Sequence, residues 1–538
     1  MFIGGPGGTG KSRVLDALRE FFKEQGQAHR FRLASFTGVA AKNIKGLTLH
    51  SALSLNKRKK RNDQGRSELV SMWRNVDYLF IDEVSMIGCN LMLEIHEALC
   101  EAKENTLPFG GINIIFAGDF AQLPPVGDTR LYSHLNTKTV GTGRGQRNVF
   151  GKLLWLSVDT VIMLHQIVRQ NAQSDPKFTG LLSRLRCGEC NDDDFNPLHS
   201  KLLSETHTDW NNPIWSSVPI LVSNNDVKDA LNEQATRAFA ARTGKRLNYY
   251  HATDKRGGSA ISDEDLQSAL NTYHSGKTEQ RMGLLPLVEG MPVMICQNYD
   301  VAHGIVNGCT GILQKIRYTV DEHGHRHAHS CVIRSESVDG PKLPHLNELE
   351  IVALEDEVTM TFTHPHSKKR CTIKRTQLPI MPAFAVTAHK SQGNTLCSAV
   401  LDIESCQSLE AAYVMLSRVK SSANIRILRP FKKTKIHTHL SQDLRTEFRR
   451  LDYLAGNIQE HPAPHHPTTV DLLNDHESEL DRWQTHFEKM AAIQFQSAAE
   501  HATASRTNDD IEMQDASLVS SLKRAKSNVQ RPTKRRRI

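Results

Sequence analysis

The sequence predicts an α/β fold with two parallel-sheet units, a small β-rich insertion in the second unit and a C-terminal tail. Through the first 155 residues, short β-branched runs such as "VDYLFIDE" and "INIIFAGD" alternate with helical stretches. This alternation is typical of parallel strands covered by helices. A second alternation contains "PILVSNNDV", "AFAVTAHKSQG", "SAVLDI" and "NIRILRP", and is interrupted by segments richer in strand and turn signals. The interruption indicates an inserted β domain.

The first unit opens on a phosphate-binding loop. The apolar residues "MFI" precede it, the helical stretch "SRVLDALREFFKE" follows it, and "GPGGTGKS" fills the pattern G-x-x-x-x-G-K-[ST]. Glycines let backbone N–H groups turn around phosphates, while the lysine reaches the terminal phosphates and the serine binds Mg²⁺. The strand and helix on either side favour this interpretation over a chance glycine-rich turn. The residues predicted to bind nucleotide here are Gly5, Gly7, Gly8, Thr9, Gly10, Lys11 and Ser12.

Two further segments of the first unit carry polar groups at strand ends. In "YLFIDEVSM" we expect Asp82 to hold Mg²⁺ through water and Glu83 to polarise an attacking water. The alternative is a pair of solvated acids. In "AGDFAQLPPV" we expect Gln122 to sense the γ-phosphate, with the stiff "LPP" fixing the loop. The alternative is an ordinary proline-containing turn.

Two arginines in the later part of the chain are candidates to complete this site from a second lobe. "LHQIVRQ" contains Arg169 and "YVMLSRVKS" contains Arg418. Each is able to act as an arginine finger that stabilises transition-state charge. Taken singly, either could instead form a surface salt bridge.

Composition limits the function classes. With 538 residues the chain should hold several domains, and 67 Lys plus Arg against 59 Asp plus Glu give a net charge of +8, which permits a polyanionic partner. The ten cysteines are scattered, and "CGEC" lacks the second pair of a zinc site, so we expect reduced thiols. No apolar run approaches the ~18 residues of a membrane span. The stretch "HGHRHAHS" is predicted to be a solvated hairpin loop instead of a metal site.

Taken together and in this order, the segments resemble the Pif-type DNA helicases, a superfamily-one group that includes Helitron-encoded relatives. The resemblance runs from residue 1 to about 430 and depends most on "GPGGTGKS", "SFTGVAAKNIKGLTLHSAL", "IDEVSMI", "GDFAQLPPV", "HQIVRQ", "VTAHKSQGNTL" and "YVMLSRVKS". It implies two RecA-like lobes with ATP and Mg²⁺ between them. It also implies finger roles for Arg169 and Arg418, a γ-phosphate contact for Gln392, and a linking role for Gly393. The expected domains are a first lobe at 1–155 with a basic insertion at 56–75, a second lobe at 156–294 and 381–435, a β-rich insertion at 295–380, and a mostly flexible tail at 436–538.

Several segments have no evident task at the nucleotide and are candidates to grip single-stranded DNA. Hydroxyl and imidazole donors suit phosphate oxygens and do not read bases. Helix capping by Thr and Ser is the alternative. The basic run "NKRKKRNDQGR" is either a solvated loop or, as the resemblance implies, a wedge at the duplex fork. The candidate DNA-binding residues are Thr37, Gly38, Thr48, His50, Ser51, His389, Lys390 and Ser391.

The resemblance implies an ATP-dependent helicase that moves 5′ to 3′ on single-stranded DNA and opens forked or tailed duplexes, in repair, recombination, telomere maintenance or transposon replication. A DNA-binding ATPase remnant with little unwinding is the alternative, and a P-loop kinase is less favoured because it needs no "AHKSQG" or "LSRVKS". We expect a monomer with no membrane partner. The basic end "KRAKSNVQRPTKRRRI" predicts the nucleus, and the short amino terminus leaves a mitochondrial form open.

Overall fold

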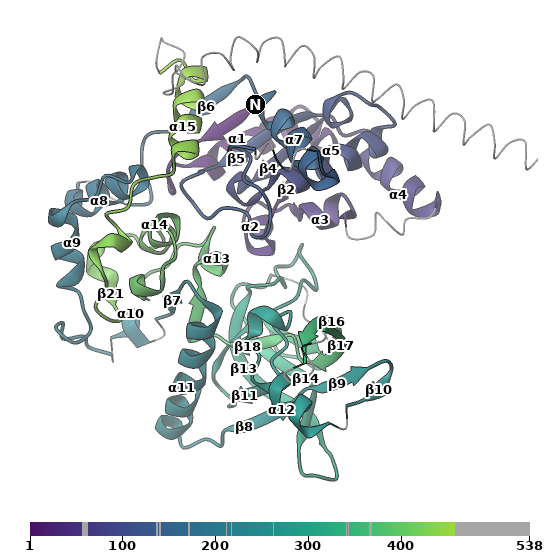
Figure 1. The fold of residues 1–538 in the computed structure, drawn as a ribbon, viewed down its shortest axis with the longest axis vertical. Helices are drawn as coiled ribbons and strands as arrows, with labels where there is room; N and C mark the ends of the chain where they lie inside the picture. The colour runs from purple at the N-terminus through teal and green to yellow at the C-terminus, as the bar shows by residue number, and fades with distance from the viewer. Residues whose placement is uncertain are drawn as a thin grey trace, which may run out of the picture. The chain divides into compact units, whose positions relative to one another are not determined.

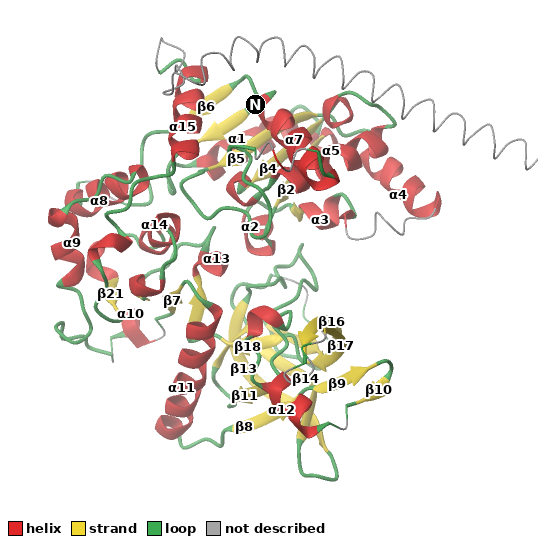
Figure 2. Cartoon of the chain, viewed as in Figure 1, coloured by secondary structure: helices red, strands yellow, loops and turns green. Residues whose placement is uncertain are grey.

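A computed structural model describes residues 1–457 except 56–62, 136–137, 139–140, 171–172, 211, 217, 262, 340–341, 343, 365–367 and 369 (Figure 1). These residues all belong to one compact unit, Met1–His461. Within it, two parallel sheets form the cores of two lobes, and a set of antiparallel strands is inserted in the second lobe. Figure 2 shows helices concentrated in the two lobes and strands in the insertion.

The first lobe is built on a six-stranded sheet in the order β3-β2-β4-β5-β1-β6, with every pairing parallel. Its strands are β1 (Phe2–Gly4), β2 (Phe31–Ser35), β3 (Leu47–Thr48), β4 (Tyr78–Asp82), β5 (Asn113–Gly118) and β6 (Val161–Met163). Its helices are α1 (Lys11–Glu24), α2 (Gly38–Asn43), α3 (Leu49–Ala52), α4 (Asp63–Trp73), α5 (Cys89–Lys103) and α7 (Gly143–Leu156), with short 3-10 turns η1 (Ala28–Arg30), η3 (Val84–Met86) and η4 (Pro108–Gly111). Because the strands are parallel, their carboxyl ends meet at one edge, where the loops after β1, β4 and β5 carry the polar residues.

An aromatic cluster anchors the first strand. The ring centroid of Phe2 lies 5.4 Å from that of Trp155 and 5.7 Å from that of Phe120. Phe116 on the neighbouring strand β5 lies 5.6 Å from Trp155. All four side chains are buried. A strand of only three residues is therefore fixed by large apolar contacts, which hold the phosphate-binding loop that follows it.

The second lobe has a four-stranded parallel sheet in the order β19-β7-β20-β21. Its strands are β7 (Ile220–Val222), β19 (Ala385–Thr387), β20 (Ala399–Leu401) and β21 (Ile425–Ile427). Its helices are α8 (Pro176–Cys187), α9 (Asp192–His199), α10 (Pro213–Ser216), α11 (Asn225–Thr243), α13 (Ala388–Ser391) and α14 (Leu409–Ser417), with 3-10 turns η6 (Ile403–Ser405), η7 (Ser422–Asn424) and η8 (Lys433–Lys435). Every residue of α14 is buried, so this helix is the centre of the lobe.

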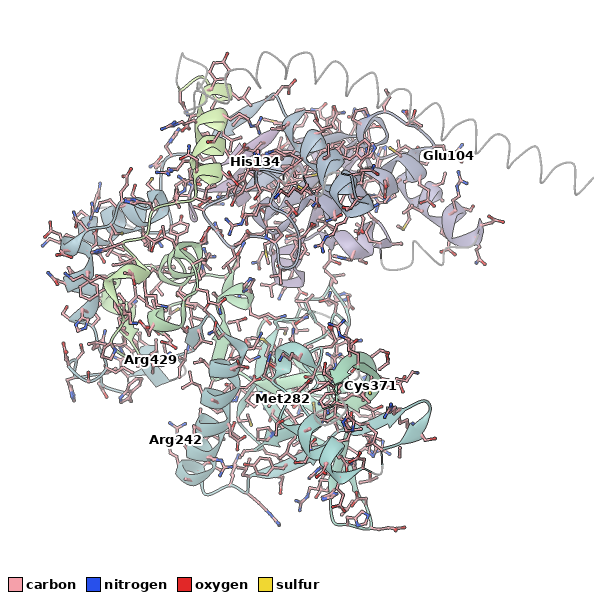
Figure 3. All side chains as sticks on the ribbon, viewed as in Figure 1. Glu104, His134, Arg242, Met282, Cys371 and Arg429 are labelled. Atoms are coloured by element: carbon pink, nitrogen blue, oxygen red, sulfur yellow. The ribbon has the colours of Figure 1, made fainter. Side chains whose placement is uncertain are left out.

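The insertion contains a seven-stranded and a four-stranded sheet. Its elements are β8 (Asn248–His251), β9 (Thr253–Arg256), β10 (Ser259–Ala260), α12 (Glu264–Asn271), η5 (Ser275–Lys277), β11 (Leu284–Leu287), β12 (Pro292–Ile295), β13 (Thr310–Val320), β14 (Arg326–Arg334), β15 (Glu350–Leu354), β16 (Asp356–Thr363), β17 (Arg370–Gln377) and β18 (Ile380–Pro382). Cys371, labelled in Figure 3, packs with Leu270, Phe362 and Ile373 in the core of the smaller sheet. In that sheet the fully buried Arg375 forms a two-pronged ion pair with Asp254, at 2.7 and 2.6 Å.

The last described helix, α15 (Gln442–Leu454), returns to the first lobe after the chain has completed the second. Trp155 Nε1 donates to Glu447 Oε1 at 2.8 Å, and Arg450 Nη2 donates to the same oxygen at 2.9 Å. The Arg450 guanidinium also lies over the Trp155 ring. Figure 1 shows α15 beside β6, the edge strand of the first sheet.

Four boundaries differ from expectation. Strand β6 pairs with β1, so the first lobe extends past residue 155. The inserted strands begin at β8, well before residue 295. Helix α15 is packed within the expected tail at 436–538, because Leu444 and Leu451 complete the core. Part of the expected basic loop at 56–75 is helix α4, whose Trp73 is fully buried, while residues 56–62 lie outside the described residues.

The histidine-rich stretch also differs. Only residues 321–325 form the turn between β13 and β14, whereas His327 and His329 lie within β14 and bond Asp321 and Glu355. Among the described residues no group of His, Cys, Asp and Glu has the geometry of a metal site. The ten cysteines all lie in the described residues, and none of them forms a disulfide there. No helix in the described part of the chain is long and apolar enough to cross a membrane.

Candidate functional site

The loop between β1 and α1 depends on glycine for two reasons. Gly5, Gly8 and Gly10 have φ values of 147°, 89° and 90°, a region that side chains with a Cβ rarely adopt. A Cβ at Gly5 would lie 2.4 Å from the Leu164 carbonyl oxygen, and one at Gly8 would lie 2.5 Å from Arg169 Cβ. The loop is therefore held closely against the chain that follows β6.

Lys11 folds back over this loop. Its Nζ donates to the carbonyl oxygens of Gly5 at 2.8 Å and Pro6 at 3.0 Å. Burial lowers the pKa of Lys11, and the charges of Asp119 and Glu83 oppose that shift. Because its two hydrogen-bond partners are main-chain carbonyls, the ammonium can turn to a phosphate without breaking an ion pair. Ser12 is exposed in the first turn of α1, where a hydroxyl can hold a metal ion.

The paired carboxylates lie at the end of β4 with an unusual backbone. Glu83 has a φ of 58°, a left-handed conformation that a residue with a side chain adopts only at some cost. Its N–H donates to Asp82 Oδ1 at 2.9 Å. Burial, and then the Glu83 charge, raise the pKa of Asp82 to about 7. Asp82 and Glu83 have no cationic side chain paired with them among the described residues, and a divalent cation could fill that role.

Two glutamines of this region have buried side chains that are incompletely bonded, and Gln392 lies beside the acids. Gln392 Nε2 donates to Glu83 Oε2 at 2.8 Å and approaches Ser85 Oγ at 3.4 Å. The Oε1 atoms of Gln392 and Gln122 are both buried and without a partner in the described part of the chain. Gly393 follows with a φ of 84°, and a Cβ there would lie 3.7 Å from Glu83 Oε1. A contact from the second lobe therefore reaches the paired carboxylates.

Arg169 is fixed between the lobes. Its main-chain N–H donates to the Gly8 carbonyl at 3.1 Å, and its Nη1 donates to the Ser417 carbonyl at 2.9 Å. The neighbouring Gln170 Nε2 donates to the carbonyls of Ser417 and Val419 at 3.2 and 2.9 Å. Burial lowers the pKa of Arg169. This segment clamps the phosphate loop to the end of α14.

Arg418 caps α14 and points at the same loop. Its Nε donates to the Val414 carbonyl at 3.0 Å and its Nη2 to Ser417 Oγ at 2.9 Å, while a Cβ on Gly7 would lie 3.3 Å from Nη2. Burial and then the charge of Arg169 lower its pKa to about 10. Neither arginine forms an ion pair within the described residues. A buried guanidinium beside a half-buried one of the same charge requires an anion to offset the desolvation.

The structure thus brings the predicted nucleotide residues together at one place. The imagined Cβ of Gly7 meets Arg418 Nη2 at 3.3 Å and Gln122 Nε2 at 3.5 Å. Lys11 lies within the electrostatic reach of Asp82 and Glu83. A loop of backbone donors, a lysine, two arginines and two carboxylates can hold a polyphosphate and a divalent cation.

Three residues of the same region were missed by the sequence analysis. Tyr413 Oη accepts from the Gly7 N–H at 3.0 Å and donates to Asp119 Oδ2 at 3.2 Å. Arg186 on α8 donates to Asp119 Oδ1 through Nε at 3.1 Å and Nη2 at 3.0 Å. Burial raises the pKa of Tyr413; burial works to lower the pKa of Arg186, but Asp119 more than offsets this and raises it. Tyr413 and Asp119 stand inside the motifs quoted above, whereas no local pattern marks Arg186.

A groove of about 550 Å³ collects most of the predicted DNA-binding residues. Thr37, Gly38, Thr48 and His50 line it from the first lobe, and His389 and Lys390 from the second. The groove is also lined by Phe36, Asn225, Lys228, Asn298 and Asn307, which the sequence analysis did not select.

Two predicted residues do not line this groove, and two others have a second role. Ser391 is buried and its Oγ donates to the Ala388 carbonyl, while Ser51 is exposed beyond the groove lining. Thr37 Oγ1 accepts from Ala40 N and Thr48 Oγ1 from Ser51 N, each at 3.2 Å. The capping alternative therefore describes these threonines as well, although both remain on the groove wall.

Two lysines, Lys228 and Lys390, line the groove from its second-lobe side. Lys390 Nζ donates to Asn307 Oδ1 at 2.5 Å, and burial lowers its pKa. Burial also lowers the pKa of His50 and of His389, so both imidazoles are neutral donors or acceptors near neutral pH. Lys228 Nζ lies 3.2 Å from Asp229 Oδ1. Lysines among mostly neutral polar groups suit a nucleic-acid backbone better than a base edge.

Comparisons with known proteins agree with this arrangement. Residues 1–196 match the family model described as PIF1-like helicase. The ATP-dependent DNA helicase PIF1 of Mus musculus is 26% identical over 433 residues, covering 80% of this chain and 57% of the relative. Its namesake in Saccharomyces cerevisiae strain YJM789 is 25% identical over 573 residues, covering 85% and 62%. The chain therefore spans about three fifths of the length of these curated relatives.

Solved structures show the same fold. A Bacteroides Pif1 helicase in complex with ADP-AlF3 and single-stranded DNA superposes with a TM-score of 0.59 at 21% identity, covering 85% of this chain and 94% of that one. The Pif1 helicase of Candida albicans gives 0.56 at 22% identity, covering 84% and 95%. At this identity the likeness establishes the two-lobed architecture, and site roles must be argued from this chain's own residues.

Proposed function

We propose that this chain, a member of the PIF1-like helicase family over residues 1–196, is an ATP-dependent helicase that moves 5′ to 3′ on single-stranded DNA and unwinds duplexes. The observation that carries the proposal is the position of Arg418. It is buried, lacks an acidic partner among the described residues, and comes from the second lobe to the phosphate loop of the first. An enzyme that used ATP within one lobe would need no such residue.

The residues of the first lobe bind and orient the nucleotide. Lys11 and the loop N–H groups hold the phosphates, and Ser12 and Asp82 hold Mg²⁺, which supplies charge neutralisation on the phosphate oxygens. Glu83 positions the attacking water and accepts its proton. Gln122 and Gln392 offer their unpartnered amide oxygens and their N–H groups to the water and the γ-phosphate.

Arg169 and Arg418 supply the charge that the transition state requires. Arg169 is anchored through the Ser417 carbonyl, and Arg418 through the Val414 carbonyl and the Ser417 hydroxyl, and these neutral partners leave both positive charges uncompensated. The developing charge on the transferred phosphoryl group is the compensation. Hydrolysis is therefore fast only while the second lobe is docked.

The groove binds the DNA strand, and residues 389–392 connect the groove to the nucleotide site. Lys390 contacts the groove, and Gln392, two residues later, contacts Glu83. A change in the carboxylate environment after hydrolysis is transmitted to the groove wall through this short segment. Alternating closure of the lobes then moves the strand.

Hydrolysis of ATP with and without single-stranded DNA tests the proposal, together with unwinding of duplexes carrying a 5′ or a 3′ tail. We expect DNA to stimulate hydrolysis and only the 5′-tailed duplex to open. Arg418→Ala should lower turnover by roughly 10³–10⁵-fold and spare DNA binding. Arg237→Ala removes an exposed arginine of α11 and serves as the matched control. Efficient opening from the 3′ tail would contradict the direction, and phosphate transfer to an acceptor without DNA would favour a kinase.

We also propose a nuclear location and a monomeric state. The basic residues that support the location lie outside the described residues: Lys523, Arg524, Lys534, Arg535, Arg536 and Arg537. Substituting these six by alanine in a fluorescently tagged full chain should abolish nuclear accumulation. Unchanged accumulation would show that this cluster is not the signal. Repair, recombination and telomere maintenance are the processes in which to test a loss of function.

A further inference from the structure

A chain of buried hydrogen bonds crosses between the lobes behind the phosphate loop. It runs from the Gly7 N–H to Tyr413 Oη at 3.0 Å, from Tyr413 Oη to Asp119 Oδ2 at 3.2 Å, and from Arg186 to Asp119 Oδ1 at 3.0–3.1 Å. Tyr413 is 2% exposed and Asp119 1% exposed. Because these two side chains are buried, losing one of the bonds would leave a buried polar group without its partner.

The four groups alternate between lobes. Gly7 and Asp119 lie on the loops after β1 and β5, whereas Tyr413 is on α14 and Arg186 on α8. The tyrosine hydroxyl uses both its acceptor and its donor capacity, which fixes its direction as well as its distance. Two helices of the second lobe are thus fastened to two loops of the first by side chains that bond one another and the Gly7 N–H.

Tyr413 and Arg418 are five residues apart on the same helix and its cap. The imagined Cβ of Gly7 lies 3.7 Å from Tyr413 Oη and 3.3 Å from Arg418 Nη2. A shift of α14 that broke the tyrosine bond would therefore withdraw the guanidinium from the loop. Displacing a reacting or stabilising group by about 1 Å is enough to cost a large part of a rate enhancement.

We propose that Tyr413, Asp119 and Arg186 form a positioning lock that docks α14 on the phosphate loop and sets the distance of Arg418 from the nucleotide. This inference rests on the proposed function, because it assumes that Arg418 acts in ATP hydrolysis. None of these three residues lines the proposed DNA-binding groove. The lock governs turnover, and it leaves affinity for single-stranded DNA alone.

Tyr413→Phe is the first test, because it keeps the ring and removes only the hydroxyl. We expect kcat for DNA-stimulated ATP hydrolysis to fall about tenfold, which corresponds to losing one buried hydrogen bond. The KM for ATP and the Kd for a single-stranded oligonucleotide should change less than about twofold, since the binding groups remain. The matched control is Tyr249→Phe, which deletes a hydroxyl that donates to Glu233 Oε1 at 2.6 Å in another part of the chain.

A double-mutant cycle with Arg186→Lys is the second test. Lysine keeps the charge but cannot reproduce the two-pronged contact with Asp119. If the three residues act as one unit, the double variant loses clearly less than the product of the two single losses. Thermal melting of each variant verifies that it is folded.

The outcomes separate the lock from the proposed function. Three results would overturn the lock and leave the helicase proposal standing, provided that the wild type hydrolyses ATP. They are a Tyr413→Phe variant with unchanged kcat, a variant that loses only DNA affinity, and a double variant whose loss of kcat equals the product of the two single losses. A wild-type chain without ATP hydrolysis would overturn both.

Discussion

The Nε2 atom of Gln392 lies 2.8 Å from Glu83 Oε2, although the two residues are 309 positions apart and belong to different lobes. Glu83 is the proposed base, and Gln392 ends the segment that carries Lys390 of the groove. The contact therefore joins the position of the strand to the position of the water-activating carboxylate. It is a direct physical connection between the two proposed activities.

Gln392→Ala should uncouple DNA binding in the groove from ATP hydrolysis. Without the amide, the second lobe no longer orients Glu83, and we expect DNA-stimulated hydrolysis to fall by roughly tenfold or more, as for a lost charge-assisted bond. DNA affinity in a fluorescence anisotropy titration should be preserved. Gln407→Ala is the control, since that exposed amide donates to Asn224 within the second lobe. Equal effects of both substitutions would count against the coupling.

Lys11→Ala and Glu83→Gln should fail at different steps. The lysine substitution removes the ammonium from the phosphates, so binding of a fluorescent ATP analogue should weaken by about tenfold or more. The glutamine substitution keeps the shape but removes the base, so ATP should bind normally while turnover falls by about 10²–10⁴. Stopped-flow binding and steady-state phosphate release measure the two quantities. A parallel loss of affinity in both variants would refute the division of roles.

Lys390→Ala should weaken single-stranded DNA binding without changing its sequence preference. A phosphate contact contributes equally at every base, and the slope of log K against log salt should decrease by about 1. Lys374→Ala, which removes an exposed lysine paired with Glu357 in the insertion, should leave the slope unchanged. Anisotropy titrations at several salt concentrations give the slope. A loss limited to one base composition would indicate base contact instead.

Asp254→Asn should destabilise the insertion. Arg375 is fully buried, and its guanidinium would keep its charge after its counter-ion is lost. Removing one partner of a buried pair lowers the free energy of unfolding by about 3–5 kcal/mol. Glu357→Gln breaks an exposed pair with Lys374 and should cost less than about 1 kcal/mol. Urea unfolding followed by circular dichroism distinguishes the two, and similar midpoints would contradict the expectation.

The local features could be predicted because each is carried by consecutive residues. The expected strands at "YLFID", "NIIFAG" and "AVT" are confirmed as β4, β5 and β19, and the phosphate loop lies between β1 and α1. The start of the insertion could not be predicted, since β8 reads "NYYH" and lies close to the long helix α11. Likewise, α15 was assigned to the tail because its polar face dominates the composition, while Leu444 and Leu451 fill the core.

The candidate site likewise contains residues that could be predicted from local sequence and residues that could not. Residues inside contiguous motifs were selected, and their catalytic roles stay predictions. Arg186 was not, because its significance lies only in its contact with Asp119, 67 positions earlier in the chain. The groove residues Asn225 and Asn298 likewise come from elements with no pattern of their own. Partnerships formed by the docking of two lobes leave no periodic signal in the sequence.

The return of α15 to the first lobe means that the second lobe is tethered at both ends. It leaves the first lobe after β6 and is joined to it again where Glu447 bonds Trp155. Two short tethers keep the effective concentration of Arg418 at the phosphate loop far above that of a lobe held by one linker. The two lobes can therefore separate without drifting apart. A chain cut after residue 435 would retain every motif yet lose this proximity and uncover Trp155.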